Sequence, residues 1–286
     1  MTNAVADDWP RRVAILGVGL LGGSVALALR RVRPQTTFVG YARDEAKRRR
    51  LTKDGIVDIA VGCIEEASRD CDVIVVATPV DHIAAMVIAA AKASPDDCLI
   101  TDVGSTKRRI VEAVSVEPAA AGKFVAAHPI AGSENSGAQY AVETLLDEKS
   151  VVLTPTDQTD ANQLEKAEHF WQLTGGETRQ MSPREHDTHL AAVSHVPHLV
   201  SALVARMVKP ESRSLVGSGW QDITRVAAGD PSLWTAICQE NRAAICQQLK
   251  AFAGELDRLL QLIEGEDDAT LTSWLAEAKR VKEQTK

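Results

Sequence analysis

The sequence has no paired-cysteine motif and no excess of basic charge. Its five cysteines are odd in number and none forms a Cys-x-x-Cys pair, so neither a disulfide framework nor a cysteine-ligated zinc site is expected. We expect reduced thiols and a cytoplasmic location. Acidic residues outnumber Lys and Arg by 39 to 32, and the net charge is −7. This balance does not favour a nucleic-acid partner, which selects a basic surface.

Neither a signal peptide nor a membrane span is expected. The N-terminal stretch MTNAVADDWPRR contains acids and no apolar core. The uncharged run from Val13 to Leu29 has nearly the length of a short span, but its glycines favour a strand, a tight turn and a helix. A length of 286 residues with 45% hydrophobic residues is typical of about two soluble domains.

The first part of the chain alternates between strand and helix patterns. Buried-strand patterns are predicted at residues 11–19, 37–42, 72–79, 98–105, 123–129 and 149–155. Helical patterns are predicted between them at 24–32, 44–55, 81–93 and 106–114. This alternation predicts an α/β domain with a mostly parallel sheet and helices on both faces.

The chain changes character after about Met181, where apolar residues recur at helical spacing. Near the C-terminus the apolar positions are Ile245, Leu249, Phe252, Leu256, Leu259 and Ile263. We therefore predict an α/β domain at 1–180 and an all-helical domain at 181–286. The apolar stripe of the helical part would be buried against a second subunit or within the chain.

A glycine motif lies between the first predicted strand and the first predicted helix. Gly17, Gly19 and Gly22, with Leu20 and Leu21 between the last two, form Gly-x-Gly-x-x-Gly. The first glycine allows a tight turn, the second lets a pyrophosphate approach the backbone, and the third lets helix pack on strand. In this context the motif predicts a dinucleotide cofactor.

The acid that binds the ribose of NAD is missing at its usual place. About twenty residues after the motif the chain has Ala42, followed by Arg43. A small residue followed by arginine suits a 2′-phosphate, so we favour NADP, with NAD as the alternative if Asp44 replaces the acid. The residues from Lys47 to Arg50 are interpreted as a solvated helix face. Thr78 and Pro79 end the third main strand and are expected at the cofactor crevice.

Two further stretches follow predicted strands at the same edge of the sheet. DVGSTK contains Ser105, and HPIAGSE contains His128. Ser105 or Thr106 is also expected to cap the following helix. His128 is a candidate acid or base beside the nicotinamide, because the ordinary pKa of histidine is near neutral. Pro129 and Gly132 would hold it in a fixed turn.

Four histidines gather at the start of the helical part: His186, His189, His195 and His198. Their spacing does not match a zinc motif such as HExxH, so no metal is predicted. His186 and His189 are interpreted as buried polar residues at a domain or subunit boundary. His195 and His198 are placed near the active site.

Arg225 stands in the stretch QDITRVAAGDPSLW with few other charges close to it. An arginine can grip a carboxylate with two hydrogen bonds, so Arg225 is a candidate substrate anchor. The alternative is a structural salt bridge with Asp222 or Asp230.

Five motifs together resemble the prephenate and arogenate dehydrogenases of tyrosine biosynthesis. They are GVGLLGGS, DVGSTK, HPIAGSE, HDTHLAAVSHVPH and QDITRVAAGDPSLW, in the family's order, and the resemblance covers about residues 11–265. It implies an N-terminal Rossmann-type dinucleotide-binding domain, an all-helical C-terminal dimerisation domain, and a homodimer. The family's reaction is an oxidative decarboxylation with hydride transfer to NAD(P).

The resemblance also implies roles for individual residues. His128 would accept the hydrogen bond of the substrate's ring hydroxyl, with Ser105 as its polar neighbour. Arg225 would anchor a carboxylate, and His195 and His198 would line the substrate pocket. Ala42 departs from the acid of many NAD-using members. The alternatives are another two-domain Rossmann oxidoreductase, similar to β-hydroxyacid dehydrogenases, and a non-catalytic NADP-binding sensor that needs neither His128 nor Arg225.

Overall fold

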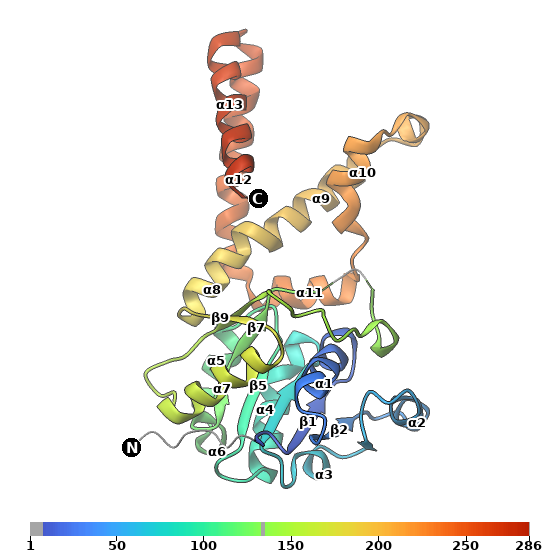
Figure 1. The fold of residues 1–286 in the computed structure, drawn as a ribbon. Coiled ribbons are helices and arrows are strands. Elements are labelled where there is room, and N and C mark those ends of the chain that lie inside the picture. Colours follow the sequence, from blue (N-terminus) through green and yellow to red (C-terminus); the bar gives the residue numbers. More distant parts are fainter. Residues whose placement is uncertain (1–7, 133–134, 286) are drawn as a thin grey trace. The chain divides into compact units, whose positions relative to one another are not determined.

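The computed structural model describes residues 8–132 and 135–285. The chain divides into two compact units, residues 1–242 and 243–286, coloured from blue to orange and from orange to red in Figure 1. The first unit contains a sheet domain and the helices that follow it. The second consists of the last two helices, α12 (Arg242–Glu264), whose first residue belongs to the first unit, and α13 (Asp268–Gln284).

The predicted parallel sheet is present, in the strand order β3-β2-β1-β4-β5-β6. Its strands are β1 (Arg12–Leu16), β2 (Thr37–Tyr41), β3 (Ile59–Val61), β4 (Val73–Val76), β5 (Leu99–Asp102) and β6 (Phe124–Val125). All neighbours pair in parallel. This order reverses between β1 and β4, which is the point where Rossmann folds bind a dinucleotide.

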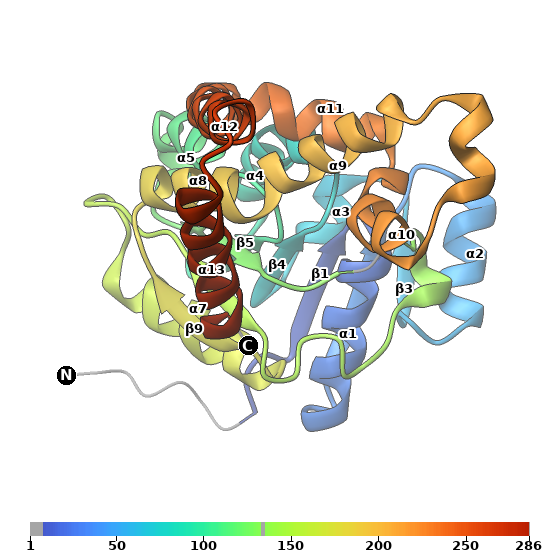
Figure 2. The ribbon, with the colours of Figure 1, turned by 90° about the horizontal axis from the view of Figure 1, so that it is seen from above.

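Alternating side chains of β1 divide the core into two layers, one on each face of the sheet. Val13 and Ile15 pack on the layer of α1 (Leu20–Val32) and α7 (Ala161–Leu173), and Ala14 and Leu16 on that of α4 (Val80–Ala93). Figure 2 shows the helices on both sides of the strands. The remaining helices of the domain are α2 (Glu45–Lys53), α3 (Ile64–Ser68), α5 (Arg108–Ser115) and α6 (Pro118–Ala121).

The stretches predicted as the last two strands do not extend the parallel sheet. Residues 123–129 divide at Ala126: β6 stays in the main sheet, whereas β7 (Ala127–Pro129) joins a second sheet with β8 (Ser150–Leu153) and β9 (Glu177–Gln180). β7 and β8 are antiparallel, and β8 and β9 are parallel. His128 is therefore the central residue of a short strand, where the sequence predicted the end of a longer one.

The described elements after Gln180 are helical, as expected. Within the first unit they are α8 (Pro183–Leu190), a π-turn at Ala191–His195, α9 (Val196–Met207), α10 (Ser218–Thr224), α11 (Pro231–Glu240) and 3₁₀ turns at Pro210–Leu215 and Arg225–Ala228. The stretch Pro183–Met207 would be long and apolar enough to cross a membrane by length and composition alone, which is weak evidence. The domain boundary at 180 stays a prediction.

Candidate active site

The glycine loop between β1 and α1 has the shape that a pyrophosphate requires. Gly17 has φ +101°, and a Cβ there would lie 2.6 Å from the carbonyl oxygen of Ala77. A Cβ on Gly22 would lie 2.6 Å from the carbonyl oxygen of Gly17, whereas one on Gly19 would meet nothing within 4 Å. Gly17 and Gly22 thus close the turn, and Gly19 leaves open space at the N-terminus of α1, where Leu20 and Leu21 form its first turn. The loop fits a dinucleotide.

The end of β2 carries an alanine at the position expected for the ribose-binding acid. Ala42 is buried and Arg43 is exposed. The carboxylate of Asp44 accepts the backbone N–H of Lys47 and caps α2. Arg48, predicted as part of a solvated face, is half-buried instead, and its guanidinium donates to the carbonyls of Ala42 and Arg43. These contacts hold the loop with Arg43 at its surface.

Two strand ends expected at the crevice are also close to this loop. Thr78 and Pro79 follow β4 after Ala77, and Pro79 is the N-cap of α4. The Oγ1 of Thr78 is buried without a hydrogen-bond partner among the described residues. Ser105 lies half-buried between β5 and α5. The glycine loop, Thr78, Pro79 and Ser105 therefore lie at the carboxyl ends of three adjacent strands, where ligands of such sheets bind.

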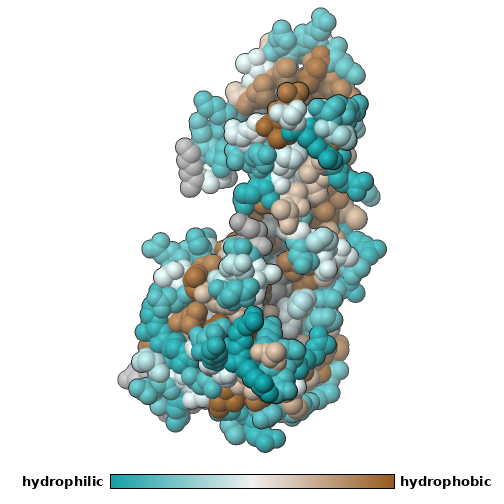
Figure 3. Space-filling view, turned by 90° about the vertical axis from the view of Figure 1, so that its right-hand side faces the viewer, coloured by the Kyte–Doolittle hydropathy of each residue, from teal (hydrophilic) through white to brown (hydrophobic). Residues whose placement is uncertain are grey.

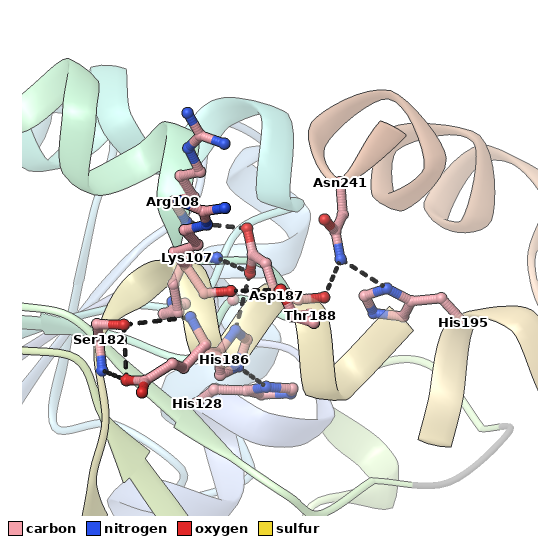
Figure 4. Close-up of polar contacts among 12 residues, drawn as sticks. Lys107, Arg108, His128, Ser182, His186, Asp187, Thr188, His195 and Asn241 are labelled. Atoms are coloured by element: carbon pink, nitrogen blue, oxygen red, sulfur yellow. Dashed lines mark hydrogen bonds and ion pairs between the residues drawn. The ribbon is translucent and has the colours of Figure 1, made fainter. Parts of the chain in front are cut away.

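His128 is buried and forms the end of a hydrogen-bonded chain of three side chains. Its Nδ1 lies 2.8 Å from Nε2 of His186, and Nδ1 of His186 lies 2.8 Å from a carboxylate oxygen of Asp187. Figure 4 shows the chain running from β7 to α8. The structure brings His186, which the sequence interpretation left at a boundary, into contact with the candidate base. His189 is exposed on the same helix.

This chain determines which nitrogen of His128 can accept a proton. The Asp187 carboxylate only accepts, so the Nδ1 of His186 carries its hydrogen and the Nε2 of His186 has a lone pair. The Nδ1–H of His128 then donates to that lone pair. The Nε2 of His128 is consequently left with a free lone pair, which is the state that a general base needs.

Electrostatics also keep His128 neutral. Burial lowers the pKa of His128 well below its ordinary value of 6.5, and the neighbouring His186 and Lys107 lower it further. Burial likewise lowers the pKa of His186, although Asp187 opposes this shift. A neutral His128 can accept a proton at neutral pH.

The carboxylate of Asp187 is held in place by the N-terminus of α5. Its carboxylate accepts the backbone N–H groups of Lys107, at 2.8 Å, and Arg108, at 3.1 Å. The N-cap of α5 is Lys107, without a side-chain cap. The prediction that Ser105 or Thr106 caps this helix is therefore wrong, because a remote carboxylate performs that role and benefits from the helix dipole.

A buried ion pair joins the Ser105 loop to the strand of His128. Asp102 pairs with the ammonium of Lys107, and both side chains are fully buried. Asp102 also accepts the backbone N–H of Gly104 and of Ala127, and Lys107 donates to the carbonyl of Ala127 at 2.8 Å. Removing one partner of such a pair typically costs about 3–5 kcal/mol. The pair therefore fixes the position of β7 relative to β5.

The remaining predicted residues lie on the helices beyond the sheet. His195 is buried at the end of the π-turn, and His198 stacks on Trp234 with a ring-centroid distance of 3.4 Å. Arg225 is exposed after α10, and Asp230 caps α11 by accepting the N–H groups of Ser232 and Leu233. Among the described residues, no ion pair joins Arg225 to Asp222 or Asp230, the two alternatives to a substrate anchor. Within the described residues, no group of three His, Cys, Asp or Glu could hold a metal ion.

Comparison with known proteins assigns the family. A model described as the nucleotide-binding domain of prephenate dehydrogenase matches residues 25–180, and one described as its dimerization domain matches 182–277. The chain belongs to the prephenate dehydrogenase family. The resemblance seen in the sequence motifs is confirmed, and so is the expected fold class of a Rossmann-like domain followed by a helical one.

Individual relatives of this family cover nearly the whole chain. Prephenate dehydrogenase of Bacillus subtilis (strain 168) is 30% identical over 93% of this chain and 74% of its own length. Cyclohexadienyl dehydrogenase of Zymomonas mobilis is 31% identical over 95% of each chain. A crystal structure of prephenate dehydrogenase from A. aeolicus, in complex with hydroxyphenyl propionate and NAD+, has a TM-score of 0.89 and 32% identity, and covers 96% of this chain and 98% of its own. Arogenate dehydrogenase of Synechocystis has a TM-score of 0.83 and 27% identity over 96% of this chain and all of its own.

The sequence interpretation missed four residues whose hydrogen bonds position the elements of the site. Asp102 and Lys107 were read only as parts of DVGSTK. No role was given to Asp187 or to Asn241, whose amide nitrogen lies 2.7 Å from the carbonyl oxygen of Asp187. A signal for Asp187 was present, because Ser182-Pro-Arg-Glu185 is a capping box that places the start of α8. That start puts the adjacent His186 and Asp187 in one turn of helix, although their partners lie far away in the sequence.

Proposed function

We propose that this protein is an NAD(P)-dependent dehydrogenase that converts prephenate, arogenate or both by oxidative decarboxylation. The observation that carries the proposal is the Asp187–His186–His128 chain, which leaves the Nε2 of His128 as a proton acceptor in a buried site. Family membership and the dinucleotide-shaped glycine loop support the same reaction. A cofactor-binding sensor without catalysis would have no use for a buried base with a fixed tautomer.

The chemistry follows from the substrate class. Prephenate and arogenate are cyclohexadienes with a hydroxyl at C4 and a carboxylate at C1. The bound nicotinamide ring supplies the hydride acceptor. His128 accepts the hydroxyl proton at Nε2 as the C4 hydrogen leaves with its electron pair, so C4 becomes a carbonyl carbon. The bond from C1 to its carboxylate then breaks, carbon dioxide leaves, and its electrons make the ring aromatic. The phenolate oxygen takes the proton back from His128. A base of this kind contributes about 10²–10⁴-fold.

For the cofactor we propose a preference for NADP over NAD. Arg43 is exposed at the end of β2, Ala42 stands at the position expected for the ribose-binding acid, and one oxygen of the Asp44 carboxylate caps α2. A ribose 2′-hydroxyl would therefore lack its usual acidic partner, whereas a 2′-phosphate would meet the Arg43 guanidinium. The A. aeolicus relative was solved with NAD+, so a direct comparison of the two cofactors is required.

We further propose that the protein is a homodimer. The second family match is to a dimerization domain. The helices of this region expose large apolar side chains, and Figure 3 shows brown, hydrophobic residues at the surface of the helical part. The exposed large apolar side chains of these helices include Leu203, Met207, Ile223, Phe252, Leu256, Leu260 and Ile263. Such surface is usually covered by a partner, and the mass in solution tests this.

The experiment that tests the function measures reduced-cofactor formation with prephenate and arogenate, each with NAD and NADP. We expect turnover with at least one substrate and a higher kcat/KM with NADP. His128→Asn should lower kcat at least a hundredfold with little change in cofactor affinity. His189→Asn, on the exposed face of α8, is the matched control and should keep its activity. No turnover of either substrate contradicts the proposed function, and unchanged turnover of His128→Asn contradicts the role of the base.

A further inference from the structure

The buried charges of the described residues gather at one place. Of the described Lys, Arg, Asp and Glu side chains, only those of Asp102, Lys107 and Asp187 are buried. All three lie around His128, and the mechanism proposed above gives Asp102 and Lys107 no step. A lysine or an aspartate is almost never fully buried unless its charge is paired. The question is what this pair does for the base.

The ion pair holds the backbone directly before His128 by both of its polar atoms. The carboxylate of Asp102 accepts the N–H of Ala127 at 3.0 Å, and the ammonium of Lys107 donates to the carbonyl of Ala127 at 2.8 Å. The same carboxylate accepts the N–H of Gly104 at 2.9 Å. The carbonyl of Ala127 belongs to the peptide group of His128, so the pair fixes the point from which the histidine ring projects.

The backbone of Lys107 holds the opposite end of the catalytic chain. Its N–H donates at 2.8 Å to the oxygen of Asp187 that also accepts Nδ1–H of His186. His186 in turn contacts His128, and Ala127 leads back to the Lys107 ammonium. Lys107 therefore closes a ring of contacts around the base, and Figure 4 shows its contact with Asp187.

Both members of the pair carry their charge. Two backbone N–H groups donate to the Asp102 carboxylate, which favours its ionised form. Burial lowers the pKa of Lys107, whereas Asp102 raises it. A carboxylate that already accepts two hydrogens needs a donor opposite, and the lysine supplies that donor as an ammonium.

Three elements bring titratable or charged groups to His128. These groups are Lys107 with Asp102 at the start of α5, His186 with Asp187 on α8, and His195 at the end of the π-turn. Lys107 is the one permanent cation in this set. Its charge lowers the pKa of His128, and the charge of Asp102 acts in the opposite direction on the pKa of His186.

The charge balance of the site therefore depends on Lys107. The single uncancelled charge is that of Asp187, which stabilises the imidazolium that forms when His128 accepts a proton. Without the ammonium, the Asp102 carboxylate would be a second buried negative charge near two histidines. Two such charges would favour a protonated ring before the substrate arrives, and a protonated His128 has no lone pair to offer.

We propose that Asp102 and Lys107 are a positioning pair for the base: they hold the backbone of His128 in place, and their balanced charges keep its ring unprotonated until the substrate binds. Both residues act through His128 and not on the reacting atoms. The inference rests on the proposed function for the role of His128 as a base.

The test replaces both members of the pair in the full chain, as Asp102→Asn together with Lys107→Met. A single replacement would leave a buried charge without its partner, which strongly destabilises a fold, whereas a neutral pair of similar size is tolerated. Asparagine keeps an oxygen for a backbone N–H, and methionine keeps an unbranched chain without the ammonium. The thermal unfolding midpoint and the cofactor Kd establish that the double variant is folded.

The first measurement is the pH dependence of turnover. On the plateau above the acid limb, kcat should fall about a hundredfold, because a displacement of about 1 Å at a reacting group costs about that factor. The cofactor Kd should change little. Loss of the Lys107 charge raises the pKa of His128, so the base becomes protonated earlier as the pH falls. The decline of kcat/KM should therefore move to higher pH.

The second measurement needs neither substrate nor turnover. The Cε1–H resonance of His128, assigned by its loss in His128→Asn, is followed by NMR as the pH is lowered. It should begin to titrate at higher pH in the double variant than in the wild type. The control is Arg31→Met together with Asp147→Asn, which removes an ion pair of the same charges from the surface of the same domain. This control should match the wild type in both measurements.

Two outcomes would overturn the inference. One is an identical titration of His128 in the double variant and the wild type, down to the pH at which each unfolds. The other is a fall of the plateau kcat with no shift of the acid limb, which would show that the pair only supports the fold. If the wild type turns over neither prephenate nor arogenate, the proposed function fails, but the NMR titration still decides whether the pair controls the protonation of His128.

Discussion

Replacing Asp187 by asparagine should abolish the function of His128 as a base, although Asp187 acts on His128 only through His186. Asp187 accepts three hydrogens: from Nδ1 of His186 and from the backbone N–H groups of Lys107 and Arg108. Nδ1 of His186 and the N–H of Lys107 share one carboxylate oxygen, and the N–H of Arg108 has the other. If an asparagine places its nitrogen at the shared position, its oxygen still accepts from Arg108 and its nitrogen donates to His186. The Nε2 of His186 then carries the hydrogen and donates to Nδ1 of His128, and the hydrogen of His128 moves to the nitrogen that must accept the proton.

The magnitude follows from the loss of the base. General-base catalysis is worth about 10²–10⁴-fold, which corresponds to roughly 3–5 kcal/mol of activation free energy. In the Ser-His-Asp triad of serine proteases, the same change of Asp to Asn costs about 10⁴ in kcat because the histidine adopts the wrong tautomer. In this orientation we therefore expect kcat of Asp187→Asn to fall at least a hundredfold. The opposite orientation would keep the amide oxygen on His186 and Lys107 and turn the nitrogen to the N–H of Arg108. Asp187→Leu offers His186 no acceptor in any orientation and should show the same loss.

The assay is kcat from the absorbance of the reduced cofactor at saturating substrate, per site that binds cofactor. Asp54→Asn, at an exposed acid after α2, is the matched control. The thermal unfolding midpoint and the cofactor Kd establish that Asp187→Asn is folded. A folded Asp187→Leu variant with kcat within threefold of the wild type would refute the reasoning about the tautomer.

Three further predictions concern the substrate, the pH profile and the cofactor. Arg225→Gln should raise KM about 10-fold or more with a smaller change in kcat, because a hydrogen bond to a charged group is worth about 1.5–3 kcal/mol; exposed Arg213→Gln is the control, and an unaltered KM counts against the anchor. Burial, His186 and Lys107 lower the pKa of His128 below 6.5, so the base stays neutral as the pH falls through neutrality. We therefore expect kcat/KM to decline only below pH 6.5. A decline of kcat/KM with a midpoint above pH 6.5 would contradict this prediction. Arg43→Ala should reduce the ratio of kcat/KM for NADP to that for NAD, and an unchanged ratio would exclude Arg43 from contact with the 2′-phosphate.

Much of the cofactor domain was predictable because its signals are local. Continuous apolar runs predicted the longer strands of the main sheet, and the glycine spacing predicted the turn at Gly17. The short strands β3 and β9 were missed, since three or four residues with partly exposed side chains carry little pattern. The switch of sheet at Ala126 was missed as well. Nothing in KFVAAHP distinguishes one seven-residue strand from two short ones in different sheets.

The site was predictable as a set of residues, less so as a network. His128 could be chosen because a histidine after a strand, followed by proline, stood out from its surroundings, and the motif resemblance then gave it a role. Its dependence on His186 and Asp187 could not be read from the sequence, because those residues are separated from it by more than fifty positions and meet it only when α8 packs on α5. Asn241 is a similar case, since its amide meets the Asp187 carbonyl across 54 positions.

The division of one strand between two sheets at Ala126 has a consequence for motion during turnover. His128 is separated from the main sheet by only two residues, and Ala127 is bonded to both Asp102 and Lys107. These bonds join the strand of the proton acceptor to the strand that ends beside the dinucleotide site, so we expect the distance between the two sites to change little during turnover. We expect any displacement that admits the substrate to come from groups outside these bonds, such as the exposed Arg225.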